Sequence, residues 1–434
     1  MASRSPDFGQ FFLMSAIPQR MHVHQLPNGL VVLGEVMPWL ESVAMSLSVP
    51  AGCQYDPEHQ AGLANFVCEM VQRGCGQWDS RQYIERLESL GVDYGSSVSV
   101  YHANFHGAMP AERLLPALAV FREVLRAPWL PEDQLEDGRQ VCHQEIRAIE
   151  DDLPQRVMVQ LRLRQYGQPC GRWSQGTLES VDSVSGEDIR AFFSRHYQPD
   201  GMILSVAGNL DWAELVDNAE QMFGDWTAHP ATVVPDHGQT RGTLHIPFDS
   251  QQAHIGVACP SLTCSDPDYF LARCATGVLS DGMSSRLFTE LRENRGLCYT
   301  VSASLHSALN QACVACYVGT SAERAQESLD ALLGELTRIR HGASGEELER
   351  LKVQIRSSLI MQQESCRARA GSMASDWLHL GRVRTREEID TLISGVQLDD
   401  LNAFLDTRPF GNFNLVTLGP EPLELTHADA PAST

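Results

Sequence analysis

Cys68 is the residue whose type could most directly do chemistry, and it lies in a segment that is typical of a buried helix. Apolar residues recur there with the spacing of one helical face, at Leu63, Phe66, Val67, Met70 and Val71. A cysteine acts as a nucleophile when a histidine takes its proton, and His102, His106 and His143 are candidates for that base. Because no motif of a known cysteine peptidase surrounds Cys68, a small buried apolar side chain is the favoured interpretation.

The segment around Cys68 resembles a known metal-binding signature. Residues 62–70 read Gly-Leu-Ala-Asn-Phe-Val-Cys-Glu-Met and are similar to the GLAHFLEHM signature of the M16 metallopeptidases, whose H-x-x-E-H is an inverted zinc motif. In that motif two histidines bind Zn²⁺, the glutamate takes a proton from the metal-bound water, and a distant glutamate completes the ligands. The resemblance places Asn65 and Glu69 at the histidine positions, Cys68 at the general-base position and Glu145 at the distant ligand.

Coordination chemistry argues against zinc at these positions. An amide oxygen is a weak, uncharged zinc ligand compared with imidazole. The oxygen donors of Asn65, Glu69 and Glu145 would suit Mg²⁺ or Ca²⁺ better, but three donors are few for a tight site. A thiol at Cys68 does not replace a carboxylate general base. We therefore expect no resident metal or other cofactor, although zinc is the metal of the family, and little hydrolysis by the chain alone.

A second family-like segment lies further along the chain. Residues 279–301 resemble the part of the M16 family in which an arginine, and a tyrosine seven residues later, reach across the cleft; Arg292 and Tyr299 have this spacing. The resemblance implies that they hold the substrate main chain and polarise the scissile carbonyl, roles that suit a guanidinium and a phenolic hydroxyl. In the family, one subunit can carry the zinc motif while a partner supplies the Arg/Tyr side. This chain resembles that partner.

The pattern of segments predicts an α+β fold that can position these residues. Residues 98–105 are typical of a strand, and we expect this strand to be an exposed edge to which an extended peptide could add. Further strands are expected at 31–33 and 43–49, and further helices at about 80–90, 112–125, 131–150 and 269–279.

An internal repeat indicates that this fold occurs twice. The segment 183–193 and the strand after it recur at 395–405, an offset of 212 residues. An Asp-Pro pair at 56–57 recurs at 266–267, an offset of 210 residues. The two offsets nearly agree, so a duplicated unit explains them better than chance.

The repeat leads to a prediction of two similar domains. Residues 229–242 are polar and contain Pro and Gly without helical periodicity, which is typical of a linker. We expect domains at 20–228 and 243–420, each a mainly antiparallel sheet packed with helices. The two domains should face one another across a peptide-binding cleft.

Composition excludes several classes of function. The chain has 434 residues with a formal net charge of -22, which disfavours binding to nucleic acid or to anionic membranes. No apolar run approaches the length of a membrane span. The first 20 residues lack a continuous apolar core of a secretory signal, so a cytoplasmic location is expected. Twelve scattered cysteines without regular spacing indicate reduced thiols rather than a disulfide framework.

Three functions remain open at the level of sequence. The favoured one is the Arg/Tyr-bearing subunit of a peptidase complex acting on peptides or unfolded proteins, as a homodimer or as a heterodimer with an active M16 homologue. The second is a non-enzymatic peptide-binding or assembly protein. The third is an active peptidase that uses an atypical metal site or Cys68.

Overall fold

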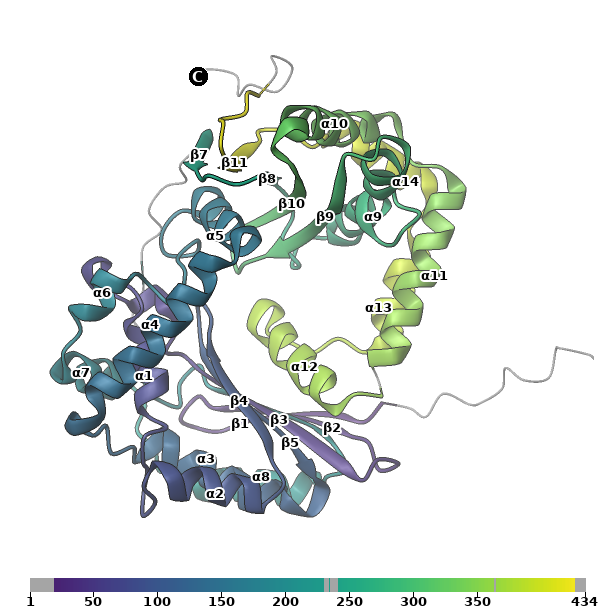
Figure 1. The fold of residues 1–434 in the computed structure, drawn as a ribbon. Coiled ribbons are helices and arrows are strands. Elements are labelled where there is room, and N and C mark those ends of the chain that lie inside the picture. Colours follow the sequence, from purple (N-terminus) through teal and green to yellow (C-terminus); the bar gives the residue numbers. More distant parts are fainter. Residues whose placement is uncertain (1–18, 230–233, 235–240, 363, 426–434) are drawn as a thin grey trace, which may run out of the picture.

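Each half of the chain contributes one β-sheet to the molecule (Figure 1). The structure is a computed structural model, and it describes residues 19–229, 234, 241–362 and 364–425. The first sheet has the strand order β1-β2-β6-β3-β5-β4 and the second has the order β7-β11-β8-β10-β9. The strands are β1 Met21–Gln25, β2 Val31–Val36, β3 Ser42–Val49, β4 Asp93–Val98, β5 Ala103–Pro110, β6 Ile203–Gly208, β7 Thr243–Pro247, β8 Gln252–Pro260, β9 Cys298–Ser307, β10 Ala312–Ser321 and β11 Asn414–Gly419.

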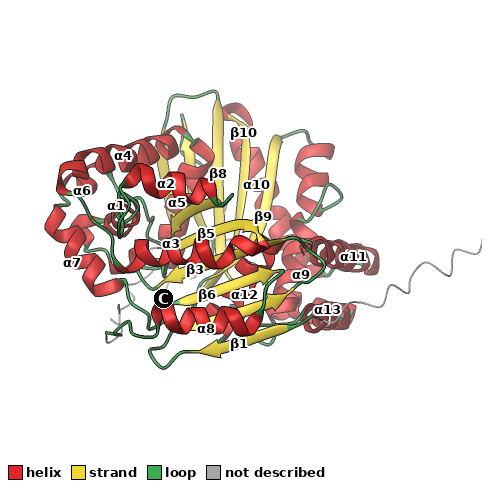
Figure 2. Ribbon diagram, turned by 90° about the horizontal axis from the view of Figure 1, so that it is seen from below, coloured by secondary structure: helices red, strands yellow, loops and turns green. Residues whose placement is uncertain are grey.

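Helices cover both faces of each sheet. Helices α3 and α8 lie on the outer face of the first sheet, as Figures 1 and 2 show from two directions. The helices of the first half are α1 Leu63–Met70, α2 Ser80–Ser89, α3 Leu114–Arg126, α4 Leu135–Asp151, α5 Leu153–Tyr166, α6 Leu178–Asp182, α7 Gly186–His196 and α8 Trp212–Phe223. Those of the second half are α9 Tyr269–Ser280, α10 Ala325–Arg338, α11 Gly345–Gln362, α12 Cys366–Leu380, α13 Arg386–Gly395 and α14 Leu398–Thr407, with a π-helix, η6, at Phe288–Asn294.

Both sheets are antiparallel except at one strand pair each. Strands β2 and β6 run parallel, with Val31 opposite Ile203. Strands β7 and β11 also run parallel, with Thr243 opposite Leu415. The remaining pairings in the described part of the chain are antiparallel. The α+β class with two mainly antiparallel sheets is therefore confirmed.

The repeat is confirmed at the level of elements. The order β3, β4, β5, α3, α4, α5 in the first half matches β8, β9, β10, α10, α11, α12 in the second. The tripeptide Ala-Glu-Arg occurs at 111–113 and again at 322–324, and each copy forms a single 3₁₀ turn between a strand and a helix. The same tripeptide therefore forms the same local structure at equivalent positions of the two halves.

One helix from each half packs on the sheet of the other half. Helix α5 packs on β8 and β11, whereas α12 packs on β3 and β6 (Figure 1). Glu35 of β2 and Arg369 of α12 form a buried ion pair with 2.7 Å between Oε2 and Nε. The Ser205 hydroxyl of β6 donates to the Ala370 carbonyl at 2.7 Å. The exchange of α5 and α12 interlocks the two halves.

The domain limits at 20–228 and 243–420 stay a prediction. The limits fall between α8 and β7. Within the expected linker, residues 230–233 and 235–240 lie outside the described residues. Because of the exchanged helices, neither sequence half covers its own sheet completely.

The strand expected at 98–105 is wrong. Strand β4 ends at Val98 and β5 begins at Ala103, so a tight connection occupies the middle of that segment. Ser99 N donates to the His102 carbonyl at 2.8 Å and closes this turn. The apolar residues at the end of β4 and at the start of β5 together resemble the sequence pattern of a single strand, which explains the wrong prediction. The edge of the sheet at this side is β4 alone, while β5 lies between β4 and β3.

The interior of each half is built from aliphatic and aromatic residues. One large cluster of buried side chains lies in the first half and another in the second. All twelve cysteines are free in the structure, and most are buried. Within the described ranges, no helix has the length and apolar character that crossing a bilayer requires.

Candidate functional site

Helix α1 carries the segment that resembles the zinc motif, and Asp56 caps the start of this helix. Gly62 precedes α1 with φ 94°, and an added Cβ there would lie 2.4 Å from the Gln175 carbonyl oxygen. The Asp56 carboxylate accepts hydrogen bonds from Gly62 N at 2.8 Å and Ala64 N at 2.9 Å. The first N–H groups of a helix have no partner within it, and Asp56 supplies one. Burial raises the pKa of Asp56 to about 7.

Helix α4 crosses α1 at Gly138, and this crossing brings Glu145 to Asn65. An added Cβ at Gly138 would lie 2.6 Å from Met70 Sδ and 3.0 Å from the Phe66 ring, so a larger residue would push the helices apart. Asn65 Nδ2 donates to Glu145 Oε2 at 2.7 Å. Two of the residues that the sequence singles out, far apart in the chain, are thus in direct contact.

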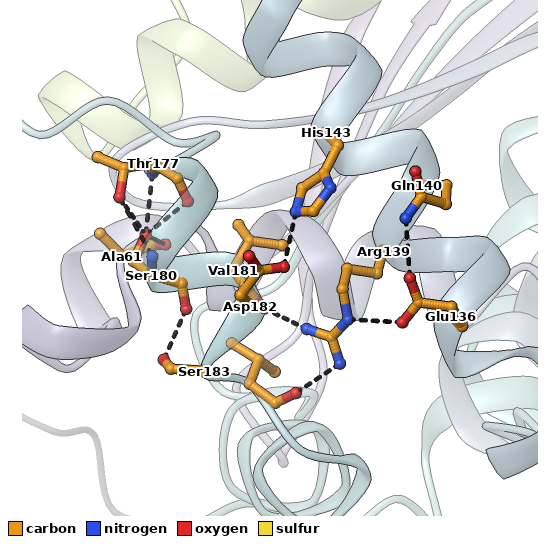
Figure 3. Close-up of polar contacts among 11 residues, drawn as sticks. Ala61, Glu136, Arg139, Gln140, His143, Thr177, Ser180, Val181, Asp182 and Ser183 are labelled. Atoms are coloured by element: carbon orange, nitrogen blue, oxygen red, sulfur yellow. Dashed lines mark hydrogen bonds and ion pairs between the residues drawn. The ribbon is translucent and has the colours of Figure 1, made fainter.

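Contacts with α6 hold the other side of α4 (Figure 3). Arg139 donates to the carbonyls of Val181 and Val184, the latter at 3.0 Å. These carbonyls lie at the carboxyl end of α6, where helix carbonyls lack partners and a cation is favourable. His143 Nε2 lies 3.0 Å from Asp182 Oδ1. The orientation of α4, and with it the position of Glu145, is therefore fixed from both sides.

Glu69 is paired with a residue that follows the end of its helix. Arg73, one turn later, approaches the Glu69 carboxylate to 2.8 Å and packs with it between α1 and α4. Partial burial raises the pKa of Glu145 above its usual value, the hydrogen bond from Asn65 lowers it, and the charge of Glu69 raises it further. The carboxylates of Glu69 and Glu145 therefore lie in one electrostatic environment, but each already has its own partner.

Cys68 lies beneath this polar surface with 3% of its area exposed. Burial, supported by the negative charges of Glu69 and Glu145, raises the pKa of the Cys68 thiol to about 12. Since the thiolate is the reactive form, Cys68 is a poor nucleophile near neutral pH.

The histidines considered as a base for Cys68 have other surroundings. His102 Nε2 lies 3.4 Å from the Gly201 carbonyl oxygen, His143 faces Asp182, and His106 lies near Asp93 and Arg367. In the part of the chain that the structure describes, none of these histidines hydrogen-bonds to Cys68. The Cys–His pairing left open by the sequence is not formed.

The polar residues of this region do not gather into a metal-binding group. Among the described residues, no set of three or more His, Cys, Asp or Glu side chains is arranged to hold a metal ion. The amide of Asn65 points its donor nitrogen at Glu145, as an amide does toward an acceptor rather than toward a cation. Arg73 brings a positive charge to the same place.

Arg73 and Gly138 belong to no catalytic motif, and the structure reveals their part in the site. The spacing of Glu69 and Arg73 was a readable signal, because residues four apart at a helix end can be neighbours, and α1 ends at Met70, just before Arg73. A glycine inside a helical pattern, such as Gly138, was a second signal of close packing. The contact of His143 with Asp182 had no local signal, since the loop between α5 and α6 determines it.

Arg292 and Tyr299 lie in the second half, on η6 and β9, with exposed side chains. Tyr299 is 88% exposed. The Arg292 guanidinium lies 4.8 Å from the centre of the Phe288 ring and, among the described residues, makes no hydrogen bond or ion pair. Among the described residues, no hydrogen bond or ion pair joins either residue to α1 or α4. Both are therefore available to a ligand or to another chain.

The curated relatives of this chain carry protease names. The chain is 25% identical over 385 residues to an "Uncharacterized zinc protease" of Rickettsia bellii, an alignment that covers 88% of this chain and 93% of that protein. It is 26% identical over 396 residues to an uncharacterized zinc protease of Bacillus subtilis, with 91% and 97% covered.

Solved structures share the fold, and family models match both halves. A peptidase M16 inactive domain from Pseudomonas fluorescens aligns with TM-score 0.85 and 20% identity, covering 94% of this chain and 99% of that chain. A protease from Helicobacter pylori gives TM-score 0.84 and 18% identity, with 93% and 100% covered. The model for Insulinase (Peptidase family M16) matches residues 31–172, and that for Peptidase M16 inactive domain matches residues 183–355. The chain belongs to the M16 peptidase family.

Proposed function

We propose that this zinc-protease-like chain holds no catalytic zinc and acts as the Arg/Tyr-bearing subunit of a peptidase complex. One observation carries the proposal: the side chains at the ligand positions are already bonded to protein groups. Asn65 donates to Glu145, and Glu69 pairs with Arg73. A zinc ion would have to break both contacts and would gain an amide oxygen in place of an imidazole.

The missing base supports the same proposal. In the family motif the residue at the position of Cys68 takes a proton from water. A thiol with a pKa of about 12, on the buried face of α1, does not serve as a general base for water near neutral pH. No hydrolytic step is therefore assigned to the α1 side of this chain.

Arg292 and Tyr299 supply the substrate-binding hydrogen-bond donors that we assign to this chain. A guanidinium and a phenolic hydroxyl are donors that can hold a peptide carbonyl as negative charge develops on its oxygen. Both side chains are exposed, and their donors are uncommitted within the described residues. The partner would be an M16 homologue with an intact H-x-x-E-H motif, and the substrate would be a peptide or an unfolded protein.

Mixing the two chains tests the proposal. The chain, purified without chelator, is combined with a zinc-containing M16 homologue from the same genome, and cleavage of a fluorogenic peptide is followed. We expect no cleavage by this chain alone and a faster reaction in the mixture than with the homologue alone. The Arg292→Ala variant should lower the rate of the mixture by roughly 10²-fold, the cost of losing one oxyanion donor.

Arg295→Ala is the matched control. Arg295 lies three residues after Arg292, is also exposed, and pairs with Glu290 at 2.8 Å. Its removal should leave the rate of the mixture unchanged. Failure of the two chains to associate in size-exclusion chromatography, or equal rates for the Arg292 and Arg295 variants, would refute the proposal. The cytoplasmic location expected from the sequence belongs to the same proposal, and cell fractionation checks it.

A further inference from the structure

A cavity of about 340 Å³ lies where equivalent elements of the two halves meet. The turn between β4 and β5 and the turn between β9 and β10 both line it, and so do the two exchanged helices, α5 and α12. The tips of the two hairpins touch, because Leu309 N donates to Tyr101 Oη at 3.1 Å. None of the candidate residues on α1, α4, η6 or β9 described above lines this cavity. It is therefore a separate site.

The floor of the cavity is apolar and its walls are held rigidly. Leu161, Ala258 and Cys313 line it and are at most 3% exposed. The Tyr166 hydroxyl of α5 donates to the His306 carbonyl of β9 at 3.1 Å, which ties one half to the other across the cavity. A volume of about 340 Å³ lies in the range of small-molecule sites, which are mostly apolar and contain a few fixed polar groups.

The mouth of the cavity is positively charged in a strongly acidic protein. Arg162 is exposed at the mouth and carries the positive charge, and among the described residues that line the cavity none is Asp or Glu. The chain as a whole contains 55 acidic residues and has a net charge of -22. His306 also lines the cavity, and burial, followed by the positive charge of Arg162, lowers its pKa, so its imidazole adds no charge near neutral pH.

Two polar groups at the cavity are not fully used by the protein. The Arg162 guanidinium makes one hydrogen bond in the described part of the chain, to the Cys170 carbonyl at 3.5 Å, and no ion pair there. Nδ1 of His379, a lining residue from α12, is buried and has no hydrogen-bond partner among the described residues. Buried polar atoms normally have partners, so an unpartnered one beside a cavity indicates a ligand or water.

We propose that this cavity binds a small apolar carboxylate, with its hydrocarbon body on the floor formed by α5, β8 and β10 and its carboxylate at Arg162. A carboxylate fits the guanidinium through charge-assisted hydrogen bonds. The absence of competing acidic side chains around the cavity in the described residues favours an anion over a cation. The ligand could be a free small molecule or the carboxyl end of a peptide with an apolar last residue, since both present the same group.

Titration calorimetry with a matched series of probes tests this site on the full chain. Octanoate, 1-octanol and octylamine share one hydrocarbon body and differ in the charge of the head group. We expect octanoate to bind at least about ten times more tightly than octylamine, with 1-octanol between them. Because both halves line the cavity, octanoate should also raise the unfolding temperature of the chain. Equal affinities for octanoate and octylamine would overturn the proposal.

Variants separate the charge from the cavity. Arg162→Gln should weaken octanoate binding by about 10-fold and leave 1-octanol unchanged, as expected for the loss of one charged hydrogen bond. Arg164→Gln, on the same helix but outside the cavity lining, is the control and should have no effect. Ala308→Trp, at the tip of the β9–β10 hairpin, should block both ligands by filling the mouth. Identical octanoate affinities for the Arg162 and Arg164 variants would contradict the assigned role of Arg162.

A second pair of probes distinguishes the two sources of the carboxylate. A tetrapeptide ending in leucine is compared with its carboxyl-terminal amide. Tighter binding of the free acid than of both the amide and octanoate would identify peptide ends as the ligand. Weaker binding of the peptide acid than of octanoate would identify a free small carboxylate. Neither arm depends on peptidase activity, so the outcome is independent of the function proposed above.

Discussion

The two halves of the molecule share a fold but treat their polar side chains in opposite ways. On α1 and α4, Asn65 is bonded to Glu145 and Glu69 to Arg73. On η6 and β9, Arg292 and Tyr299 are exposed, and their donors are uncommitted within the described residues. The polar side chains of the first region bond to one another, whereas the donors of the second region are free to bind another molecule.

The helix that corresponds to α1 in the second half sharpens the contrast. At the offset of 210 residues given by the Asp-Pro pairs, Ala275, Val278 and Leu279 of α9 stand where α1 has Asn65, Cys68 and Glu69. All three α9 residues are buried in the core. A duplicated helix therefore keeps its packing role in both copies, and the polar residues of α1 are an addition that packing does not require.

Restoring the two histidine ligands should have the largest effect. The Asn65→His/Glu69→His double variant breaks both existing contacts and offers two imidazoles beside Glu145. We expect its zinc affinity to rise by roughly three orders of magnitude or more, because imidazole and carboxylate are the ligands that zinc prefers. Competition with a fluorescent chelator measures the affinity. The single Glu69→His variant is the control, and its zinc affinity should rise much less. Equal rises in zinc affinity for the two variants would contradict the contrast drawn between the two regions.

Removing the Tyr299 hydroxyl should have a smaller effect, on the other side of the comparison. Tyr299→Phe keeps the ring and deletes one donor, so we expect the peptide-cleavage rate of the mixture with an active homologue to fall by roughly 10-fold. Tyr55→Phe, a half-buried tyrosine stacked on His196, should leave the rate unchanged. A similar loss in both variants would show a structural rather than a substrate-binding role.

The exchanged helices make the two regions parts of one folding unit. Arg369→Met leaves Glu35 buried without its charged partner, with one hydrogen bond from Gln19 remaining, and should lower the free energy of unfolding by about 3–5 kcal/mol. Arg367→Met, on the same helix, removes an exposed pair with Asp93 and should cost about 0–1 kcal/mol. Urea denaturation measures both. Comparable losses would mean that the buried contact between the halves adds no more than an exposed one.

Cys68 should matter least. The Cys68→Ala variant is expected to lose about 1 kcal/mol of stability from the smaller buried side chain and none of the activity of the mixture. Iodoacetamide should modify Cys68 more slowly than the partly exposed Cys264, because burial keeps the Cys68 group protonated. A large loss of activity in the Cys68→Ala variant would instead support the hypothesis that Cys68 is a catalytic nucleophile.

The sequence predicted the architecture because its signals are local and occur twice. The apolar face of α1, the recurring Asp-Pro pair and the segment near 183–193 each indicate an element without knowledge of the rest. The strand at 98–105 failed because the apolar residues at the ends of β4 and β5 merge across a four-residue turn. The exchange of α5 and α12 has no local signal, since packing between distant segments decides it.

For the site, residue types were predictable and contacts were not. Asn65, Cys68 and Glu69 could be aligned with a motif, which indicated weakened metal binding. That Asn65 donates to Glu145 depends on the crossing of α4 over α1 at Gly138, a tertiary feature. The cavity between the halves could not be predicted either, because its lining comes from segments spread along the chain from Ser99 to His379.

The zinc content of the chain tests the central claim most directly. The protein is purified without chelator, incubated with one equivalent of zinc, passed through a desalting column and measured by elemental mass spectrometry. The contacts of Asn65 and Glu69 predict well under about 0.1 zinc per chain, with the Asn65→His/Glu69→His variant retaining close to one. Retention of about one zinc by the natural chain, lost in a Glu145→Ala variant, would contradict the account.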